Sequence, residues 1–417
     1  MSSEGQASNW RRWHWPVLLC GAMIMGCNRG APEPASNAVT ALPWDSVLVL
    51  ARGSTVTWRM WRGDPSINAF IDQWVAPRLV AQYGITLEVV PGQGPGIVNL
   101  LVTEREAGAR GSTDLLWING ATFASLRREA LLLGPWADRL PNAQYVDTAS
   151  PIIARDFEQD PGGYESPWGQ VEYALIYDNA RVSSPPRNVT ALGAWIDAHP
   201  GRFTHDQSFS GMTFLKILMY ALAGGAERFQ GGFDSLAYVA GRDSVMGWLT
   251  RHRASFWRGG ATYPAGVAEL HRLFANGEID FSMSNNENEV ITKVRQGILP
   301  VTARPLLLTD GMLANAHYLG ISVNARNPAG AMVVADFLLS PEAQLEKLRP
   351  EVWADGSVLD VSRIPEPWRG RFMAQARDQH ALSPESLRLH ARPEVAPEYH
   401  ERLTEDWRRM IRANAPR

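Results

Sequence analysis

Short apolar runs alternate with helix-spaced apolar residues in the first third of the chain. The strand-like runs are 47–50, 55–60, 86–90 and 114–118, and the segments with apolar residues every three to four positions are 66–79, 97–107 and 121–129. The runs are typical of buried strands and the wider spacing of amphipathic helices. Strands that alternate with helices indicate a mainly parallel sheet with helices on both faces.

The pattern changes in the middle of the chain. A longer strand-like stretch at 169–177 precedes a helix-rich section, and a second extended stretch follows at 297–308. Helices are predicted at 191–198, 212–223, 234–251 and 267–276, a strand at 279–283, a returning strand at 318–323, and further helices at 329–339, 341–348, 383–392 and 397–412. Two extended crossings on either side of a helix-rich section indicate two lobes joined by a two-strand hinge.

This pattern predicts an α/β fold of two lobes, each a mixed sheet flanked by helices, with a cleft between them. We expect residues 46–172 to form the first part of lobe 1, residues 173–304 to form lobe 2, and residues 305–417 to return to lobe 1 with the C-terminal helices. A chain of 417 residues is long enough for two or three domains.

The N-terminal segment, residues 1–27, has the order of an export signal. Arg11 and Arg12 precede an apolar stretch at 15–25, and Gly26 stands directly before Cys27. This order of charged, apolar and small residues is typical of a secretory signal. The apolar stretch is about half the roughly twenty residues that span a bilayer. We therefore expect it to be removed rather than retained as a membrane helix.

The last four residues of this signal resemble a bacterial lipobox, which implies cleavage before Cys27 and acyl chains on that cysteine. An ordinary signal peptide cut near Cys27 is the alternative. The only other cysteine, Cys20, lies within the signal, so no disulfide is expected in the mature protein. Residues 28–45 are rich in Ala, Pro, Ser and Asn without apolar periodicity, which predicts a flexible tether before a folded body that begins near Ser46.

Composition narrows the function further. The formal net charge is -3, with 40 basic and 43 acidic residues, so the chain lacks the basic surplus that nucleic-acid binding requires. Its 16 tryptophans are more informative, because large aromatic side chains are costly to leave in water and also stack on ligands. We expect most of them in the core and a few in a binding site.

Four segments carry a resemblance to a known family: 56–63 with its following helix, 114–120, 134–137 and 335–343. They resemble the extracellular solute-binding proteins of ABC importers, which have the type II periplasmic-binding fold, and 335–343 resembles a helix that recurs in that family. Segments 114–120 and 134–137, followed by 140–142, are similar to the YnjB-like group. The resemblance implies a monomeric protein without a cofactor that captures a small molecule. It also implies two partners, a membrane permease and its ATPase subunit.

In such clefts, ligands lie at the carboxyl ends of strands and the N-termini of helices. This rule selects polar and aromatic residues in six segments as candidate ligand-binding residues. They are Trp61, Arg62, Asp64 and Ser66; Trp117 and Asn119; Trp168, Gln170 and Glu172; Ser210 and Thr213; and Asn285, Asn286, Glu287 and Tyr318. Their neighbours Gly63, Ile118, Gly120, Gly211, Glu289, Asn315 and His317 complete the candidate surface.

Structural roles remain open for several of these residues. Ser66 can instead cap a helix, Trp117 can belong to the core, and Glu172 can stabilise the hinge. One of Ser210 and Thr213 is enough to cap the helix that starts there.

The candidate side chains favour a cationic or polar organic solute, such as a thiamine-like molecule or a polyamine. Asp64, Glu172, Glu287 and Glu289 give the cleft a negative bias, which Arg62 opposes, and aromatic faces attract cations. Iron is disfavoured because the chain lacks the adjacent tyrosine pair that ferric-binding relatives use. A divalent-metal site through His205 or His317 and a carboxylate stays open.

Enzyme function is disfavoured. The chain contains no G-x-S-x-G, H-E-x-x-H or G-x-x-x-x-G-K-[ST] motif, so the commonest serine-hydrolase, zinc-protease and P-loop signatures are missing. Two alternatives remain. One is an exported hydrolase in which Asp64 and Glu172 act as an acid and base pair, and the other is a lipid-anchored adaptor that binds no small molecule.

Overall fold

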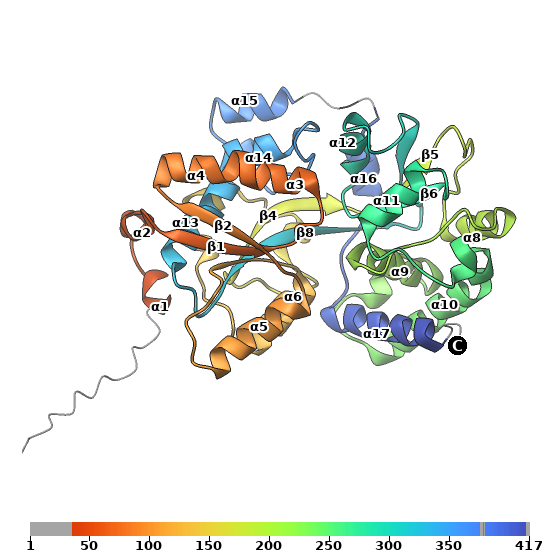
Figure 1. Cartoon of the computed structure of the whole chain (residues 1–417), viewed down its shortest axis with the longest axis horizontal. Helices are drawn as coiled ribbons and strands as arrows, with labels where there is room; N and C mark the ends of the chain where they lie inside the picture. Colours follow the sequence, from red (N-terminus) through yellow and green to blue (C-terminus); the bar gives the residue numbers. More distant parts are fainter. Residues whose placement is uncertain (1–35, 376–377, 379, 414–417) are drawn as a thin grey trace, which may run out of the picture. The chain divides into compact units, whose positions relative to one another are not determined.

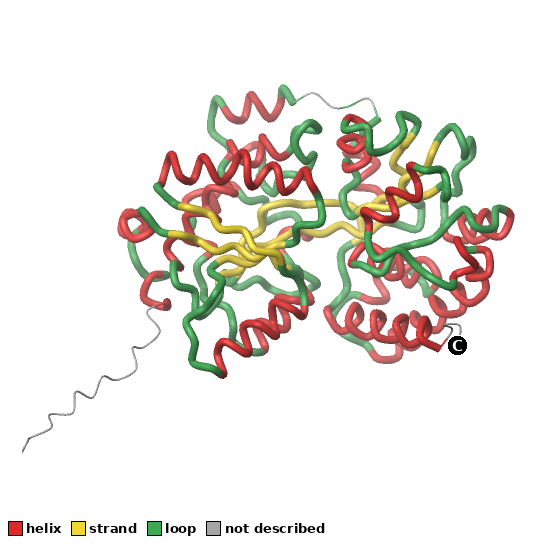
Figure 2. Tube along the Cα trace, in the orientation of Figure 1, coloured by secondary structure: helices red, strands yellow, loops and turns green. Residues whose placement is uncertain are grey.

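The computed structural model describes residues 36–375, 378 and 380–413 (Figure 1). The predicted signal at 1–27, its lipidation site Cys27 and the first part of the predicted tether lie outside the described residues. Helices surround two separate β-sheets in the described part (Figure 2). None of the described helices is both long and apolar enough to cross a membrane.

The larger sheet has the strand order β2-β1-β3-β8-β4, with the short strand β9 (Ala391–Arg392) beside β8. Its strands are β1 (Thr55–Met60), β2 (Thr86–Pro91), β3 (Leu115–Ile118), β4 (Glu165–Glu172) and β8 (Met312–Ile321). The first three are mutually parallel, because a helix follows each of them and returns the chain. In contrast, β8 is antiparallel to both of its main neighbours.

Helices cover both faces of this sheet. They are α3 (Pro65–Ala69) and α4 (Ala76–Tyr83) with a π-helical segment Phe70–Val75 between them, and α5 (Pro95–Glu106), α6 (Gly120–Arg128), α13 (Pro328–Leu339) and α14 (Pro341–Lys347). Pro77 cannot donate to the preceding turn, and the π-helical segment just before it accommodates that lost hydrogen bond. The predicted helix at 66–79 is therefore one continuous but irregular helix.

The smaller sheet has the order β6-β5-β7, with both pairs antiparallel. Its strands are β5 (Ala174–Asp178), β6 (Phe281–Ser284) and β7 (Ala303–Leu306). The helices around it are α8 (Val189–Ala198), α9 (Phe209–Leu222), α10 (Ser235–His252), α11 (Val267–Ala275), α12 (Glu289–Arg295) and α17 (Pro397–Ala413). The helices predicted for this region are present.

Each sheet has its own hydrophobic core, and these two cores define two lobes. Trp58, Leu116 and Phe337 belong to the first core, whereas Leu175 and Phe281 belong to the second. The paired strands β4 and β8 connect the lobes (Figure 1). Thus β4 ends at Glu172 where the second lobe begins, and β8 starts among side chains of the second core and ends among those of the first.

The C-terminal segment corrects one predicted boundary. Residues 305–417 were expected to return to lobe 1 throughout, but Tyr399, Leu403 and Trp407 of α17 are buried in the second core. The chain therefore crosses between the lobes a third time, after α15 (Trp368–Met373), and α16 (Pro384–His390) and α17 complete lobe 2. The buried residues of α17 recur every four positions, a pattern that predicts a helix with one apolar face but not the core that this face contacts.

The N-terminal end of the folded part corrects two further predictions. Residues 47–50 were expected to be a strand, and residues up to 45 a tether, but α1 (Ser36–Val39) and α2 (Trp44–Ala51) occupy this region. Val47 and Ala51, four positions apart, are buried where α2 packs on α13. The exposed Val49 and Leu50 made the segment look uniformly apolar, as a buried strand would be.

Replacing Leu403 by alanine tests the position of α17 in the second core. The Leu403 side chain is 1% exposed, so Leu403→Ala should lower the free energy of unfolding by about 2–5 kcal/mol. The matched control is Leu236→Ala on α10, which is 80% exposed and should change it by less than about 0.5 kcal/mol. Denaturant unfolding of both variants measures the difference, and equal effects would contradict the assignment of α17 to this core.

Candidate ligand-binding cleft

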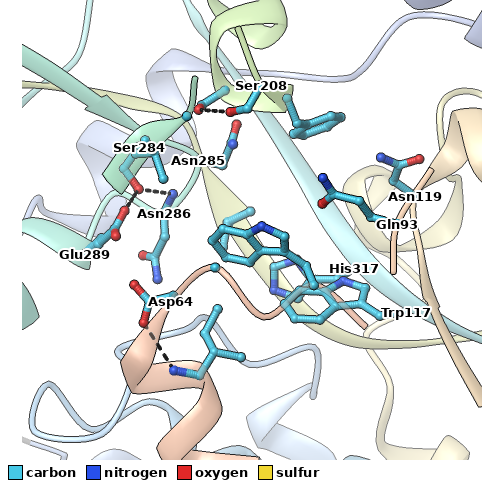
Figure 3. Close-up of a pocket in the computed structure, with 18 of the residues that line it drawn as sticks. Asp64, Gln93, Trp117, Asn119, Ser208, Ser284, Asn285, Asn286, Glu289 and His317 are labelled. Carbon is cyan, nitrogen blue, oxygen red and sulfur yellow. Dashed lines mark hydrogen bonds between the residues drawn. The ribbon is translucent and has the colours of Figure 1, made fainter. Parts of the chain in front are cut away.

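A cavity of about 410 Å³ lies between the two lobes. Its lining comes from loops after β1 and β3 and from β8 in lobe 1, and from the starts of α9, α11 and α12 in lobe 2. This volume is in the range of small-molecule sites. Figure 3 shows side chains of both lobes directed into the same space.

Aromatic rings form the lobe 1 wall of the cavity. Trp61, Trp117, His317 and Trp353 all line it. The rings of His317 and Trp353 stack with centroids 5.7 Å apart and planes at 11°, and Trp117 meets the His317 ring edge-on at 5.3 Å. Gly63 is needed beside this wall, because a Cβ atom there would overlap the Trp61 indole.

Trp168 supports this wall from behind. It was predicted to contact ligand, but its side chain is fully buried and is absent from the cavity lining. Its ring lies 4.9 Å from that of Trp117 and 5.4 Å from that of Trp58. Trp168 therefore lies one layer behind the aromatic residues that line the cavity.

The lobe 2 wall begins at the N-terminus of α9. The carboxylate of Asp206 accepts hydrogen bonds from the Ser208 backbone N–H at 2.6 Å, from the Ser210 hydroxyl at 2.6 Å and from the Gly211 N–H at 3.2 Å. Asp206 thus satisfies two backbone N–H groups at the start of this helix. Ser208, Phe209 and Ser210 remain on the cavity surface.

Two carboxylates from different lobes meet at one end of the cavity. Asp64 caps α3, accepting from the Ser66 N–H at 2.6 Å and the Ile67 N–H at 3.2 Å, and its second oxygen accepts a hydrogen bond from the Lys293 ammonium. Glu289 accepts from the Ser284 hydroxyl. Burial alone would raise the pKa of Glu289, but its interactions with His271, Lys293 and Ser284 outweigh burial and lower this pKa to about 2.

A third carboxylate, Asp355, lines the cavity beside the aromatic wall. Its oxygens are 2.8 Å from His317 Nε2 and 2.7 Å from Lys347 Nζ. Burial opposes ionisation of Asp355, but His317 and Lys347 hold its pKa below the usual value. Gly169 lies against this carboxylate, where a Cβ atom would overlap it. Every carboxylate that lines the cavity therefore has cationic or hydrogen-bonding partners within the chain.

Among the described residues, no group of three or more His, Cys, Asp or Glu side chains is arranged to hold a metal ion. His205 is fully buried among aromatic rings, and this burial lowers its pKa to about 4. His317 has Asp355 as its carboxylate neighbour.

Comparison with known proteins agrees with this geometry. Residues 74–362 match the family described as bacterial extracellular solute-binding protein. The chain belongs to this family. Protein YnjB of Escherichia coli (strain K12) is 34% identical over 361 residues, which cover 85% of this chain and 92% of YnjB. The resemblance to solute-binding proteins of ABC importers and to the YnjB-like group is thus confirmed, and membership implies an extracytoplasmic location.

Solved structures show the same fold. Iron-bound HitA from Pseudomonas aeruginosa has a TM-score of 0.58 and 17% identity, over 87% of this chain and 100% of that one. AfuA from Actinobacillus pleuropneumoniae, solved with fructose-6-phosphate, has a TM-score of 0.59 and 14% identity, over 86% and 99%. The predicted two-lobed type II fold is confirmed. Because these two relatives hold chemically different ligands, the fold does not determine the solute.

About half of the predicted site residues line the cavity. Those that line the cavity are Trp61, Asp64, Ser66, Trp117, Asn119, Ser210, Asn285 and Asn286, with the neighbours Gly63, Ile118, Glu289, Asn315 and His317. The predicted residues that do not line the cavity are Arg62, Trp168, Gln170, Glu172, Thr213, Glu287 and Tyr318, with the neighbours Gly120 and Gly211.

Local contacts explain most of the exceptions. Arg62 pairs with Asp72 at 2.5 Å, Thr213 donates to the Phe209 carbonyl at 3.0 Å, and Tyr318 donates to the Ile153 carbonyl at 2.8 Å. On β4, Val171 lines the cavity. Because successive strand residues point to opposite faces, its neighbours Gln170 and Glu172 point away.

Sequence reasoning missed several lining residues. Gln93 follows β2, so the rule applied to the other strand ends would have found it. Ser208 and Phe209 lie just before the predicted start of α9. Lys293 lies within α12. Trp353 and Asp355 lie in an irregular loop after α14, where no periodic pattern indicates which side chains face the cleft.

The hinge contains a buried pair of carboxyl groups that also changes the predicted charge of the cleft. The backbone N–H of Glu172 donates to Glu287 Oε2 at 2.9 Å. Burial, with a contribution from Glu287, raises the pKa of Glu172 to about 9, and burial raises that of Glu287 to about 7. Glu172 is therefore protonated at neutral pH, and neither residue lines the cavity. Of the four carboxylates in the predicted negative bias, only Asp64 and Glu289 line the cavity, and Asp355, which was not predicted, joins them.

The raised pKa of Glu172 predicts a pH-dependent loss of stability. In the unfolded chain this carboxyl group ionises near pH 4.5, whereas in the folded protein it ionises near pH 9, so its stabilising contribution is lost as pH rises between these values. Glu172→Gln should remain neutral throughout. Its thermal midpoint, relative to wild type, should therefore increase between pH 5 and pH 9.

Thermal unfolding followed by circular dichroism at pH 5, 7 and 9 measures this effect. Glu106→Gln, on the exposed side of α5, is the matched control and should follow the wild-type profile. If the curves of wild type and Glu172→Gln remain parallel over this range, the hinge carboxyl is not held protonated.

Proposed function

We propose that this solute-binding protein captures a positively charged polar organic solute, with a flat ring such as that of a thiamine-like molecule, and delivers it to an ABC importer. The observation that carries the proposal is the wall of Trp61, Trp117 and Trp353 beside the carboxylates at one end of the cavity. Indole faces attract cations, more strongly when water is excluded.

The polar part of the lining supports an organic ligand. Side-chain amides of Gln93, Asn119, Asn285 and Asn315 line the cavity from both lobes. Amides can both donate and accept hydrogen bonds, so they suit a solute with several heteroatoms. Few convergent polar groups within a largely apolar, aromatic pocket are typical of small-molecule sites.

The mechanism follows from the position of the cavity between two separate cores. A solute that contacts Trp117 in lobe 1 and Ser210 in lobe 2 stabilises the closed arrangement, and its differential affinity for that arrangement shifts the population. The β4 and β8 crossings act as the hinge. A membrane permease then accepts the solute from the closed complex, and a separate ATPase subunit supplies the energy.

The two alternative functions are less well supported. Asp64 and Glu172 cannot act together as the acid and base of a hydrolase, because only Asp64 lines the cavity. Both Asp64 oxygens are also engaged by α3 and Lys293. A ligand-free adaptor would be expected to fill its cleft with apolar side chains, whereas this cleft is open and partly polar.

Binding to a defined panel tests the proposal. Thermal midpoints of the purified protein are measured with thiamine, putrescine, spermidine, sugars, amino acids, sulfate and phosphate. We expect a rise with a ring-bearing cation, because a ligand that binds only the folded state stabilises it. Trp117→Ala should weaken that binding by about tenfold or more.

The matched control is Trp368→Ala, on α15 and outside the cavity lining, which should bind like wild type. A midpoint that rises with sulfate or phosphate and not with any cation would overturn the proposed solute class. Conversion of the ligand to a product would instead favour the hydrolase.

We further propose that acyl chains on Cys27 anchor the protein to a membrane, with the following residues as a tether. Cys27→Ser should abolish incorporation of labelled palmitate in cells and release the protein from the membrane fraction, because the thioether needs the thiol. Cys20→Ser, within the predicted signal, should still be labelled. Labelled Cys27→Ser protein would contradict the anchor.

A further inference from the structure

We propose that Lys293 is an ammonium group built into the cleft, and that it makes the site selective for solutes with one positive charge over diamines and polyamines. This inference rests on the proposed function, since it concerns the charge of the solute in the same cavity. Beyond the proposed function, the inference names Lys293 as the residue that determines selectivity for the charge of the solute.

Lys293 occupies the place that a ligand ammonium would take between two carboxylates. Its side chain is 4% exposed and lines the cavity. Its Nζ atom donates to Asp64 Oδ2 from lobe 1 and lies 3.8 Å from Glu289 Oε1 in lobe 2. A buried ammonium is costly unless it is paired, so the chain has placed it where carboxylates from both lobes converge.

The other oxygen atoms of Asp64 and Glu289 already have partners within the chain, so few acceptor positions are left for a second cation. The Oδ1 atom of Asp64 is used by the N-terminus of α3. Glu289 Oε2 accepts from Ser284, and its Oε1 lies 3.4 Å from His271 Nε2. An additional ammonium at this end would lie next to Lys293 and be repelled by it.

The charge of the whole cavity leads to the same conclusion. Three carboxylates line it, Asp64, Glu289 and Asp355, and two ammonium groups pair with them, Lys293 and Lys347. One negative charge remains before any protonation of His271 or His317. A single positive charge neutralises this excess, whereas a diamine would leave the enclosed cavity with a net positive charge, which is unfavourable at low dielectric.

Lys293 also connects the two lobes. A nearby uncharged residue makes a similar connection, so the effect of losing an interlobe contact can be measured apart from the effect of losing a charge. One turn further along the same helix segment, Gln296 Nε2 donates to the Ser66 hydroxyl at 2.9 Å. This second link joins the same two elements without a charge. Gln296→Ala is therefore the matched control for loss of an interlobe contact.

The test compares putrescine and thiamine binding to wild type, Lys293→Met and Gln296→Ala by calorimetry on the purified protein. Wild type should bind putrescine weakly. Lys293→Met should bind putrescine at least about tenfold more tightly, because both cavity-end carboxylates are then free for an ammonium. Gln296→Ala should retain the wild-type preference.

A second variant keeps the inference testable if Lys293→Met does not fold. Asn285→Asp replaces a half-buried lining residue by an isosteric one and adds a negative charge while Lys293 stays in place. It should also gain putrescine affinity. Folded Lys293→Met or Asn285→Asp protein without this gain, or wild type that prefers putrescine, would overturn the inference. Failure of the proposed function gives a different result, because wild type then binds neither thiamine nor putrescine. The putrescine affinity of the two variants can still be measured in that case.

Discussion

The antiparallel pairing of β4 and β8 is the constraint on which the rest of the structure depends. These strands belong to the sheet of lobe 1 and extend to the edge of lobe 2, so one set of backbone hydrogen bonds connects two separate cores. A cavity forms because neither core can extend across the boundary. The aromatic wall depends on the same pairing, since Trp168 on β4 and His317 on β8 support Trp117 and Trp353 from the two strands.

Burial of charge governs the chemistry of the cleft. Carboxylates enclosed between lobes must be paired, protonated or hydrated, and this protein shows two of these solutions. Asp64, Glu289 and Asp355 are paired with lysines or histidines within the chain, whereas Glu172 at the hinge has its pKa raised by burial. As a result, a cleft that looks strongly acidic from its composition retains only a small excess of negative charge. Indole faces and side-chain amides line the cavity beside these paired carboxylates.

The fold was largely predictable, and the site only in part. Alternation of strands and helices, the first crossing and the family-like segments indicated the two-lobed architecture. The predicted second crossing at 297–308 was wrong, because that stretch contains β7 of lobe 2, and β8 makes the crossing instead. Strand ends and helix starts predicted Trp61, Asp64, Trp117 and Asn119 as cleft residues, because backbone topology places such positions together. The same rule does not specify which layer a side chain occupies, so it included the buried Trp168. The rule for strand ends and helix starts also does not apply to irregular loops, and Trp353 and Asp355 lie in such a loop.

The sequence by itself determined most of the local elements, the number of lobes and the family, because these depend on short-range periodicity and on contiguous motifs. Tertiary structure alone decided which core receives α17 and which carboxylates face the cavity. It also decided which cations neutralise them. The pairing of Asp64 with Lys293 joins residues from opposite lobes, and no local pattern records such a contact. Energies of buried charges depend on these distant partners, so the selectivity of the cleft is a property of the folded protein.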